Sequence, residues 1–289
     1  MISRFILVAA LSACAAACSV TDIQNHRLTN SRLSTIKDLS DLTVSLKRYD
    51  LDKTLLVLDI DDTLLTSSAF FGSDRWYEWQ SGKGKDEHGN ILAISQTQSI
   101  SCRFDVLGIT YEIAANQPTQ ENAAAIVKAL NIDKLVLTAR SDRYRAATHR
   151  ELTENGFSFG DEHLLPFNEI YRESISEGGR TAHVSYIDGV YMVAGLNKGK
   201  RLTHMLDKIH KEYSNVILVD DKLDNINNVR IALAQKGIDF HGYHYTRVNK
   251  SISAKDIKEG EEAAQKLDSY IARYFSGRSS RLSGRHCSY

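Results

Sequence analysis

Leu-Leu-Val-Leu-Asp-Ile-Asp-Asp-Thr, residues 55–63, joins a short apolar run directly to three carboxylates. A continuous apolar run of this length is typical of a strand that is buried on both faces. Open α/β sheets bind ligands beyond the carboxyl ends of their strands, which is where Asp59 and Asp61 fall. Burying carboxylates beside such a strand costs free energy unless a metal or another partner compensates. The stretch therefore indicates either a functional site or an exposed Asp-rich turn.

Two further apolar runs have the same form. Residues 135–137 lead into Thr138, and residues 216–219 lead into Asp220 and Asp221. Helical segments separate these runs, and strands that alternate with helices indicate a parallel sheet. We therefore predict an α/β fold, a Rossmann-like parallel sheet with helices on both faces. The three polar strand ends should meet at one edge of that sheet.

The remaining segments are predicted from periodicity and turn signals. Apolar residues at helical spacing predict an amphipathic helix over 31–48, after a polar tether that starts at residue 19. Asp188-Gly189 predicts a hairpin over 181–195, and Asn197 is expected to cap a helix. Residues 66–118 break the alternation and are interpreted as an insertion. The core is then 49–65 and 119–275, ending in a helix over 254–275, with a disordered tail over 276–289.

The first 18 residues read as an export signal of the lipoprotein type. Arg4 precedes an apolar stretch too short for a comfortable membrane span. Leu-Ser-Ala-Cys at 11–14 resembles the bacterial lipobox, in which the cysteine, here Cys14, is lipidated, and Cys18 is a second candidate. Simple cleavage and a buried N-terminal helix are the alternatives. The expected location is the periplasm or the membrane surface of the cell envelope, through one lipid anchor.

Composition narrows the class of protein. The chain has 289 residues, a formal net charge of zero and 42% hydrophobic residues, so it can bury a core and shows no charge bias toward nucleic acid. Export would allow Cys102 and Cys287 to be oxidised. Their large separation and the expected loose tail argue against a pairing between them. Without a Cys-x-x-Cys motif, a zinc knuckle is not expected.

Four motifs in order resemble the haloacid dehalogenase (HAD) superfamily. Each falls at a strand end or a helix start, and the resemblance covers about residues 50–245. The motifs are Leu-Val-Leu-Asp-Ile-Asp-Asp-Thr at 56–63, Leu-Val-Leu-Thr-Ala-Arg at 135–140, Asn-Lys-Gly at 197–199 and Ile-Leu-Val-Asp-Asp at 217–221.

The resemblance implies a Mg²⁺-dependent phosphatase acting on a small phosphorylated substrate. Asp59 would be the nucleophile that forms an aspartyl-phosphate, and Asp61 the general acid and then base. Lys198 and Thr138 would bind the phosphoryl oxygens, with Lys200 as a rival to Lys198. The metal ligands would be Asp59, the backbone carbonyl of Asp61, Asp220 and, less directly, Asp221. Asp62 would be a bystander, and Asp224 either a supporting residue or a solvated acid.

Within that superfamily, the chain is more distantly similar to secreted and lipoprotein acid phosphatases. Asp62 stands where those phosphatases carry Glu, and their Gly-Asp-Asn pattern is missing from the fourth motif. The chain resembles better a bacterial, exported HAD-like family of unknown function. The resemblance also implies that the insertion over 66–118 is a small cap. Trp76 and Trp79, within it, would either line the substrate mouth or belong to the core.

Two other readings share the same residues. One is a non-catalytic surface lipoprotein on a HAD scaffold, since a fold does not fix a function. The other is phosphotransfer to an alcohol acceptor in place of water.

Overall fold

The computed structural model describes residues 31–113, 116–161, 164–165, 169–275 and Cys287. The predicted signal segment, with Cys14 and Cys18, lies outside the described residues. So do the tether over 19–30 and the expected tail apart from Cys287. No helix among the residues described is long and apolar enough to cross a membrane.

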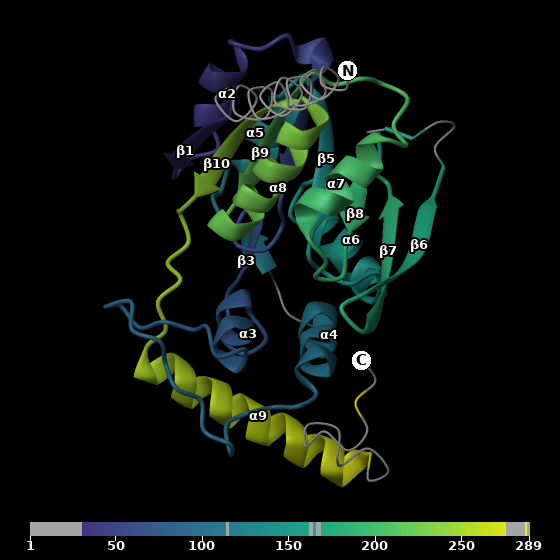
Figure 1. The fold of residues 1–289 in the computed structure, drawn as a ribbon. Coiled ribbons are helices and arrows are strands. Elements are labelled where there is room, and N and C mark those ends of the chain that lie inside the picture. The colour runs from purple at the N-terminus through teal and green to yellow at the C-terminus, as the bar shows by residue number, and fades with distance from the viewer. Residues whose placement is uncertain (1–30, 114–115, 162–163, 166–168, 276–286, 288–289) are drawn as a thin grey trace, which may run out of the picture.

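A single eight-stranded sheet forms the centre of the molecule (Figure 1). Its order is β1 (Arg32–Ile36), β10 (Asp239–Tyr245), β9 (Asn215–Asp220), β2 (Thr54–Leu58), β5 (Asp133–Thr138), β8 (Val190–Met192), β7 (Arg180–Ile187) and β6 (Tyr171–Glu177). The pairings from β1 through β8 are parallel, whereas β7 is antiparallel to both of its neighbours. The predicted α/β fold is confirmed, and the three strands with polar ends lie side by side at the middle of the sheet.

Helices cover both faces of the sheet. Side chains alternate along β2, so that Leu55 and Val57 pack toward one face and Leu56 and Leu58 toward the other. The first face is covered by α7 (Lys198–Leu206) and α8 (Leu223–Lys236), which lie in front of the sheet in Figure 1. The second is covered by α2 (Asp41–Leu46), α5 (Ala123–Ala129) and α6 (Arg145–Glu154). The three central strands, β2, β5 and β9, are thereby almost wholly removed from water.

The segment 66–118 lies beyond the carboxyl ends of the strands. It contains α3 (Asp74–Gln80) and α4 (Arg103–Ile113), and β3 (Leu65–Ser67) pairs with β4 (Asn116–Pro118) at its base. The last helix, α9 (Ala254–Tyr274), runs beneath this segment in Figure 1. A Cβ at Gly260 would lie 3.0 Å from the Phe70 ring and 3.7 Å from the Trp76 ring. Although the sequence grouped α9 with the core, the helix packs on the insertion.

Several local predictions were confirmed and one was wrong. The hairpin turns at Asp188-Gly189, and Asn197 caps α7. The helix predicted over 31–48 is instead strand β1 followed by the short α2. Its apolar spacing fits a helix, but pairing with β10 supplies backbone hydrogen bonds that a local pattern does not reveal. Two 3₁₀ turns, η1 (Leu51–Lys53) and η2 (Asp142–Tyr144), complete the elements.

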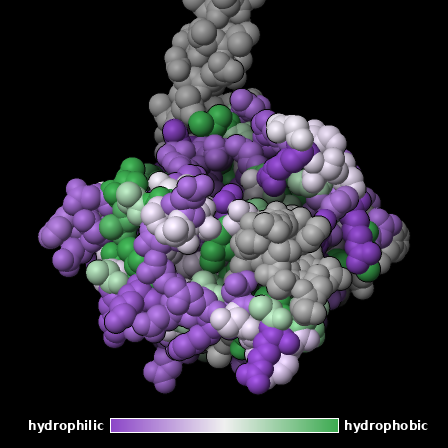
Figure 2. Space-filling model, turned by 90° about the horizontal axis from the view of Figure 1, so that it is seen from below, coloured by the Kyte–Doolittle hydropathy of each residue, from purple (hydrophilic) through white to green (hydrophobic). Residues whose placement is uncertain are grey.

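A disulfide joins Cys102 to Cys287 across 185 residues of sequence. The sequence argued against this pairing, and the structure overturns that expectation. Cys102 directly precedes α4, so the bond ties the C-terminal end of the chain to the insertion. Seen from below, this side of the molecule is mostly hydrophilic, with hydrophobic side chains in small separate groups (Figure 2).

Candidate active site

Three charged side chains meet at the carboxyl ends of β2 and β9. Lys198 Nζ donates to Asp59 Oδ1 and to Asp220 Oδ2, each at 2.6 Å. The Lys198 side chain is 2% exposed and that of Asp220 is fully buried. Asp59 continues β2 and donates its backbone N–H to the Val219 carbonyl of β9. The two carboxylates are therefore held side by side by strand pairing, and the lysine lies between them.

Close packing of two helices places Lys198 in this position. Asn197 caps α7 by accepting from the Lys200 N–H at 3.0 Å, which makes Lys198 the first helical residue. A Cβ at Gly199 would lie 2.1 Å from the Asn228 carbonyl oxygen, so only glycine lets α7 approach α8 this closely. Lys200, the rival candidate, is exposed and pairs with Glu177 at 2.8 Å. Of the two lysines, only Lys198 reaches the carboxylates.

Burial controls the charge of this cluster. It raises the pKa of Asp59 to about 7, and Asp220 and Asp61 add to that rise while Lys198 opposes it. Burial also raises the pKa of Asp220. The pKa of Lys198 is raised because the attraction of Asp220 and Asp59 outweighs the effect of its own burial. Two carboxylates, Asp59 and Asp220, share the one positive charge of Lys198, and a divalent cation would relieve the excess of negative charge.

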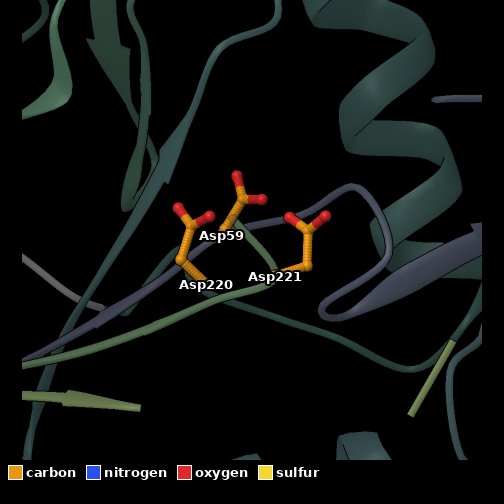
Figure 3. Close-up of side chains that lie close together, drawn as sticks. All are labelled: Asp59, Asp220 and Asp221. Carbon is orange, nitrogen blue, oxygen red and sulfur yellow. The ribbon is translucent and has the colours of Figure 1, made fainter. Parts of the chain in front are cut away.

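Asp221 completes a set of ligands for a cation. The carboxylates of Asp59, Asp220 and Asp221 each offer an oxygen within 4.8 Å of the others, and all three point the same way in Figure 3. The Asp221 carboxylate is buried, its Oδ1 accepts no hydrogen bond, and Lys250 Nζ lies 2.7 Å from its Oδ2. Burial raises the pKa of Asp221 to about 7. Oxygen ligands of this kind and number suit Mg²⁺.

Asn225 supports Asp220, a role that the sequence had left open for Asp224. The Asn225 side-chain amide donates to both Asp220 oxygens, at 3.0 and 3.1 Å. The Lys222 backbone N–H donates to Asp220 Oδ1 at 2.9 Å. Asp224 is exposed and is a solvated acid at the start of α8. The amide belongs to the first turn of α8, and the carboxylate that it orients ends β9.

Asp61 lies against Arg140, which the second motif contains. Arg140 Nε and Nη2 donate to the Asp61 carboxylate at 2.8 to 3.2 Å, and Nη1 donates to Glu151 at 2.8 Å. The guanidinium also lies 4.1 Å from the centre of the Tyr111 ring. Burial opposes the charge of Arg140, but Asp61 and the other acidic partners raise its pKa well above the usual value. A planar guanidinium held on several sides fixes the orientation of Asp61.

Thr138 ends β5 and is fully buried. Its Oγ1 accepts the Arg140 backbone N–H at 3.2 Å. Because the oxygen accepts in this contact, the hydroxyl hydrogen of Thr138 can still be donated to another group. This places a donor on the strand next to the one that carries Asp59.

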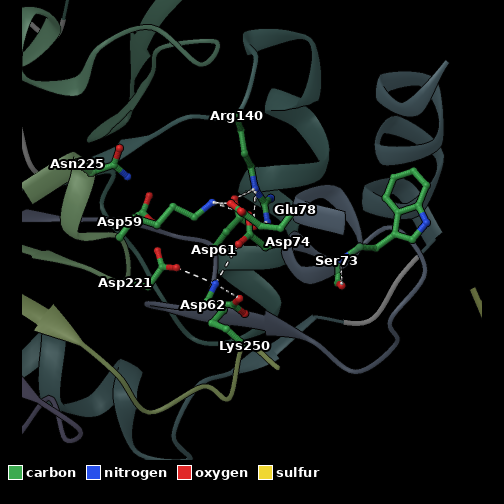
Figure 4. A network of polar contacts seen from close by, with 12 residues as sticks. Asp59, Asp61, Asp62, Ser73, Asp74, Glu78, Arg140, Asp221, Asn225 and Lys250 are labelled. Atoms are coloured by element: carbon green, nitrogen blue, oxygen red, sulfur yellow. Dashed lines mark hydrogen bonds and ion pairs between the residues drawn. The ribbon is translucent and has the colours of Figure 1, made fainter. Parts of the chain in front are cut away.

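A chain of alternating charges links the site to the insertion (Figure 4). Lys250 contacts Asp62, Asp74 at 2.9 Å and Asp221 at 2.7 Å. Lys222 contacts Asp74 at 3.0 Å and Glu78, one turn further along α3, at 2.8 Å. Burial by itself would raise the pKa of Asp74, but the charges of Lys222 and Lys250 outweigh burial and lower that pKa to about 2.

This charge chain contains residues that sequence reasoning missed. Asp62, taken as a bystander, accepts from Thr66 Oγ1 at 2.6 Å as well as contacting Lys250. In the sequence, Lys222 directly follows the pair Asp220-Asp221, and this adjacency was the only signal that could have pointed to Lys222. Lys250 lies in a loop with no motif, so nothing in the sequence pointed to it.

Trp76 is not at the site. Its side chain is 1% exposed and belongs to the core, as does that of Trp79. The expectation that Trp76 lines the substrate mouth is wrong, because α3 turns its ring toward Phe71 and α9. The alternative, a core aromatic, is correct.

Comparison with known proteins gives a family and little else. No curated protein matches the chain. Among solved structures, the chain is similar to the Legionella pneumophila effector Ceg4, with 13% identity and a TM-score of 0.35 over 75% of this chain and 95% of that one. The model of a family described as a protein of unknown function (DUF2608) matches residues 34–275. The matched segment spans both the sheet and the insertion, and the chain belongs to the DUF2608 family.

Proposed function

We propose that this protein is a Mg²⁺-dependent phosphomonoester hydrolase of the HAD type, exported to the bacterial envelope. The observation that carries the proposal is the contact of one buried lysine with two carboxylates from adjacent strands, at 2.6 Å each. Such a cluster costs folding free energy, since each buried charge loses its hydration. The order of the four motifs agrees with this assignment, and the predicted signal segment supports export.

The nucleophile in this proposal is Asp59. Lys198 contacts its Oδ1, which leaves Oδ2 to attack phosphorus. The new P–O bond forms as the bond to the leaving oxygen breaks, giving an aspartyl-phosphate. Asp61 donates a proton to the leaving oxygen and then takes one from the water that hydrolyses the intermediate. Arg140 orients the Asp61 carboxylate through both steps.

Two side chains bind the phosphoryl oxygens. Lys198 supplies a positive charge, and its raised pKa keeps that charge at neutral pH. Thr138 donates its hydroxyl hydrogen, since its oxygen already accepts from Arg140. Phosphoryl transfer depends mainly on this kind of positioning and charge neutralisation.

Asp59, Asp220 and Asp221 would hold the metal, together with the Asp61 backbone carbonyl. Asp221 Oδ1, which is buried and accepts no hydrogen bond, supports this ligand set. When bound, Mg²⁺ would neutralise negative charge on the phosphoryl oxygens. Asn225 keeps Asp220 in place for that role.

Turnover of p-nitrophenyl phosphate by the purified protein tests the proposal. We expect hydrolysis with Mg²⁺, loss of activity in EDTA and recovery when Mg²⁺ is returned. Asp59→Asn should abolish turnover, and Asp52→Asn, at an exposed position, serves as the matched control. Full activity of Asp59→Asn would refute the nucleophile assignment. A folded wild type without activity on any phosphomonoester would favour the surface-lipoprotein reading, and transfer to an added alcohol would favour a phosphotransferase.

A further inference from the structure

A second group of carboxylates lies beside the proposed metal ligands. Asp62, Asp74 and Asp221 each offer an oxygen within 4.8 Å of the others. The proposed ligands Asp59, Asp220 and Asp221 meet the same limit, so the two groups share Asp221. The second group is assembled from distant parts of the chain, namely the loop after β2, the start of α3 and the residue after β9. Two adjacent groups of this kind resemble the centres at which hydrolases hold two metal ions.

The second group already holds a cation, the ammonium of Lys250. Its Nζ lies 2.9 Å from Asp74 and 2.7 Å from Asp221, and it also contacts Asp62 (Figure 4). These two distances exceed the roughly 2.0–2.1 Å of a Mg²⁺–oxygen bond, so the spacing suits an ammonium. One ammonium in contact with all three carboxylates occupies the position that a metal ion would take.

The loop that carries Lys250 is fixed to the insertion. Arg75 Nη1 donates to the Ser251 carbonyl at 3.1 Å, and the Ile252 N–H donates to the Lys85 carbonyl at 2.9 Å. The Ile252 side chain is buried in the hydrophobic core. Lys250 therefore extends from a held backbone. Its side chain is 36% exposed, so water reaches the position of the ammonium, and a hydrated Mg²⁺ could reach it as well.

The charge of the whole site shows what the ammonium contributes. Ion pairs join eight carboxylates to four cations across the site and the charge chain. The carboxylates are those of Asp59, Asp61, Asp62, Asp74, Glu78, Glu151, Asp220 and Asp221, and the cations are Arg140, Lys198, Lys222 and Lys250.

With every group ionised, the excess is four negative charges, and one Mg²⁺ at the proposed ligands leaves two. Loss of Lys250 would raise the remaining excess to three, whereas a second divalent ion in its place would lower it to one. The lysine therefore occupies a position that would otherwise attract a divalent ion.

We propose that Lys250 is the built-in second cation of this site. Its ammonium binds the second group of carboxylates in place of a second divalent ion, and it leaves Asp221 Oδ1 for the one metal of the proposed hydrolase. Lys250 is a positioning residue, because it acts through the ligand Asp221 and links that ligand to Asp74 of the insertion. The inference rests on the proposed function, in which the first group of carboxylates binds the metal.

The number of ions bound by the purified protein tests this inference. Mn²⁺ takes the same oxygen ligands as Mg²⁺ and is paramagnetic, so dialysis at pH 8 counts the bound ions and EPR shows whether two lie together. We expect about one Mn²⁺ per chain for the wild type, with the hyperfine lines of an isolated ion, and about two for Lys250→Ala, with the spectrum of a coupled pair. Lys250→Arg keeps the charge and should bind one. Lys255→Ala, at an exposed position of α9, is the matched control and should also bind one.

Two further variants locate the second ion and guard against misfolding. Asp62→Asn in the Lys250→Ala background should return the count to about one, because it removes a ligand that belongs to the second group alone. Lys250→Gln loses the charge but keeps a hydrogen-bond donor, and it replaces Lys250→Ala if that variant does not fold. It should also bind about two ions as a coupled pair.

The ion counts separate this inference from the proposed function. One ion in both the wild type and the uncharged variants would overturn the inference and leave the proposed metal centre intact, and so would a coupled pair in the wild type. No ion in the wild type but one in Lys250→Ala would refute the proposed metal ligands, while the second group would stand as a cation site filled by Lys250. No ion in either protein would refute both.

Discussion

Replacing Asp59 with Asn should stabilise the metal-free protein while it abolishes activity. Burial raises the pKa of Asp59 from its ordinary value of 3.8 to about 7, so its ionised form is unfavourable in the folded chain. Below about pH 4 this carboxyl is neutral in both the folded and the unfolded chain. As the pH rises from about 4 to about 7, the folded chain loses stability relative to the unfolded chain, in which the carboxyl ionises freely. Asn is neutral at every pH and similar in shape. The variant therefore avoids a cost that the wild type meets at neutral pH.

The size of the effect follows from the same shift. Each pKa unit corresponds to about 1.4 kcal/mol, so the limit at pH 8 is about 4 kcal/mol. Lys198 loses one of its two carboxylate partners in the variant, which returns part of that gain. We expect the free energy of unfolding of Asp59→Asn to exceed that of the wild type by about 2–3 kcal/mol at pH 8. The difference should be less than half as large at pH 5, where the wild-type carboxyl is mostly protonated in the folded state.

Denaturant unfolding in EDTA at pH 5 and pH 8 measures the difference. Asp52→Asn, at an exposed position, controls for the loss of one negative charge. With Mg²⁺ at pH 8 the wild type should recover stability, and the variant should gain less, because the stabilisation by a ligand grows with its concentration relative to Kd and the variant has lost one of the proposed carboxylate ligands. A variant less stable than the wild type at pH 8 in EDTA would refute the reasoning. So would an equal difference at both pH values.

Other perturbations address the rest of the molecule. Arg140→Lys should lower kcat on p-nitrophenyl phosphate at least tenfold and cost about 2 kcal/mol in denaturant unfolding, because lysine cannot reproduce the fork that holds Asp61; wild-type values for both would contradict this role. Cys102→Ser should lower unfolding stability by about 2–4 kcal/mol through loss of the bond to Cys287. Reductant should bring the wild type to the level of that variant, and no change in either case would show that the bond does not stabilise the fold. Cys14→Ser should abolish labelling of the expressed protein by a palmitate analogue, and persistent labelling would exclude lipidation at that residue.

Sequence alone determined the centre of the fold and most of the site residues. Three apolar runs had to be buried strands, and their polar ends placed Asp59, Thr138 and Asp220 at one edge of a sheet. This worked because residue type and local period together specify a buried strand, and parallel strands share the edge at which they end. Asn197 likewise placed Lys198 at the start of a helix, since capping is a local requirement, and the resemblance favoured Lys198 over Lys200 because Lys198 directly precedes Gly199.

Tertiary structure decided how those residues are partnered. It placed Lys198 between two carboxylates, set Arg140 on Asp61 and brought Lys250 to the site from a loop that carries no motif. It also turned Trp76 into the core, made a strand of residues 32–36 and closed the bond from Cys102. Each of these depends on residues far apart in the chain that meet only through packing and strand register. A local pattern carries no record of such partners, since an ion pair or a strand pairing gains its free energy only once the whole fold has formed.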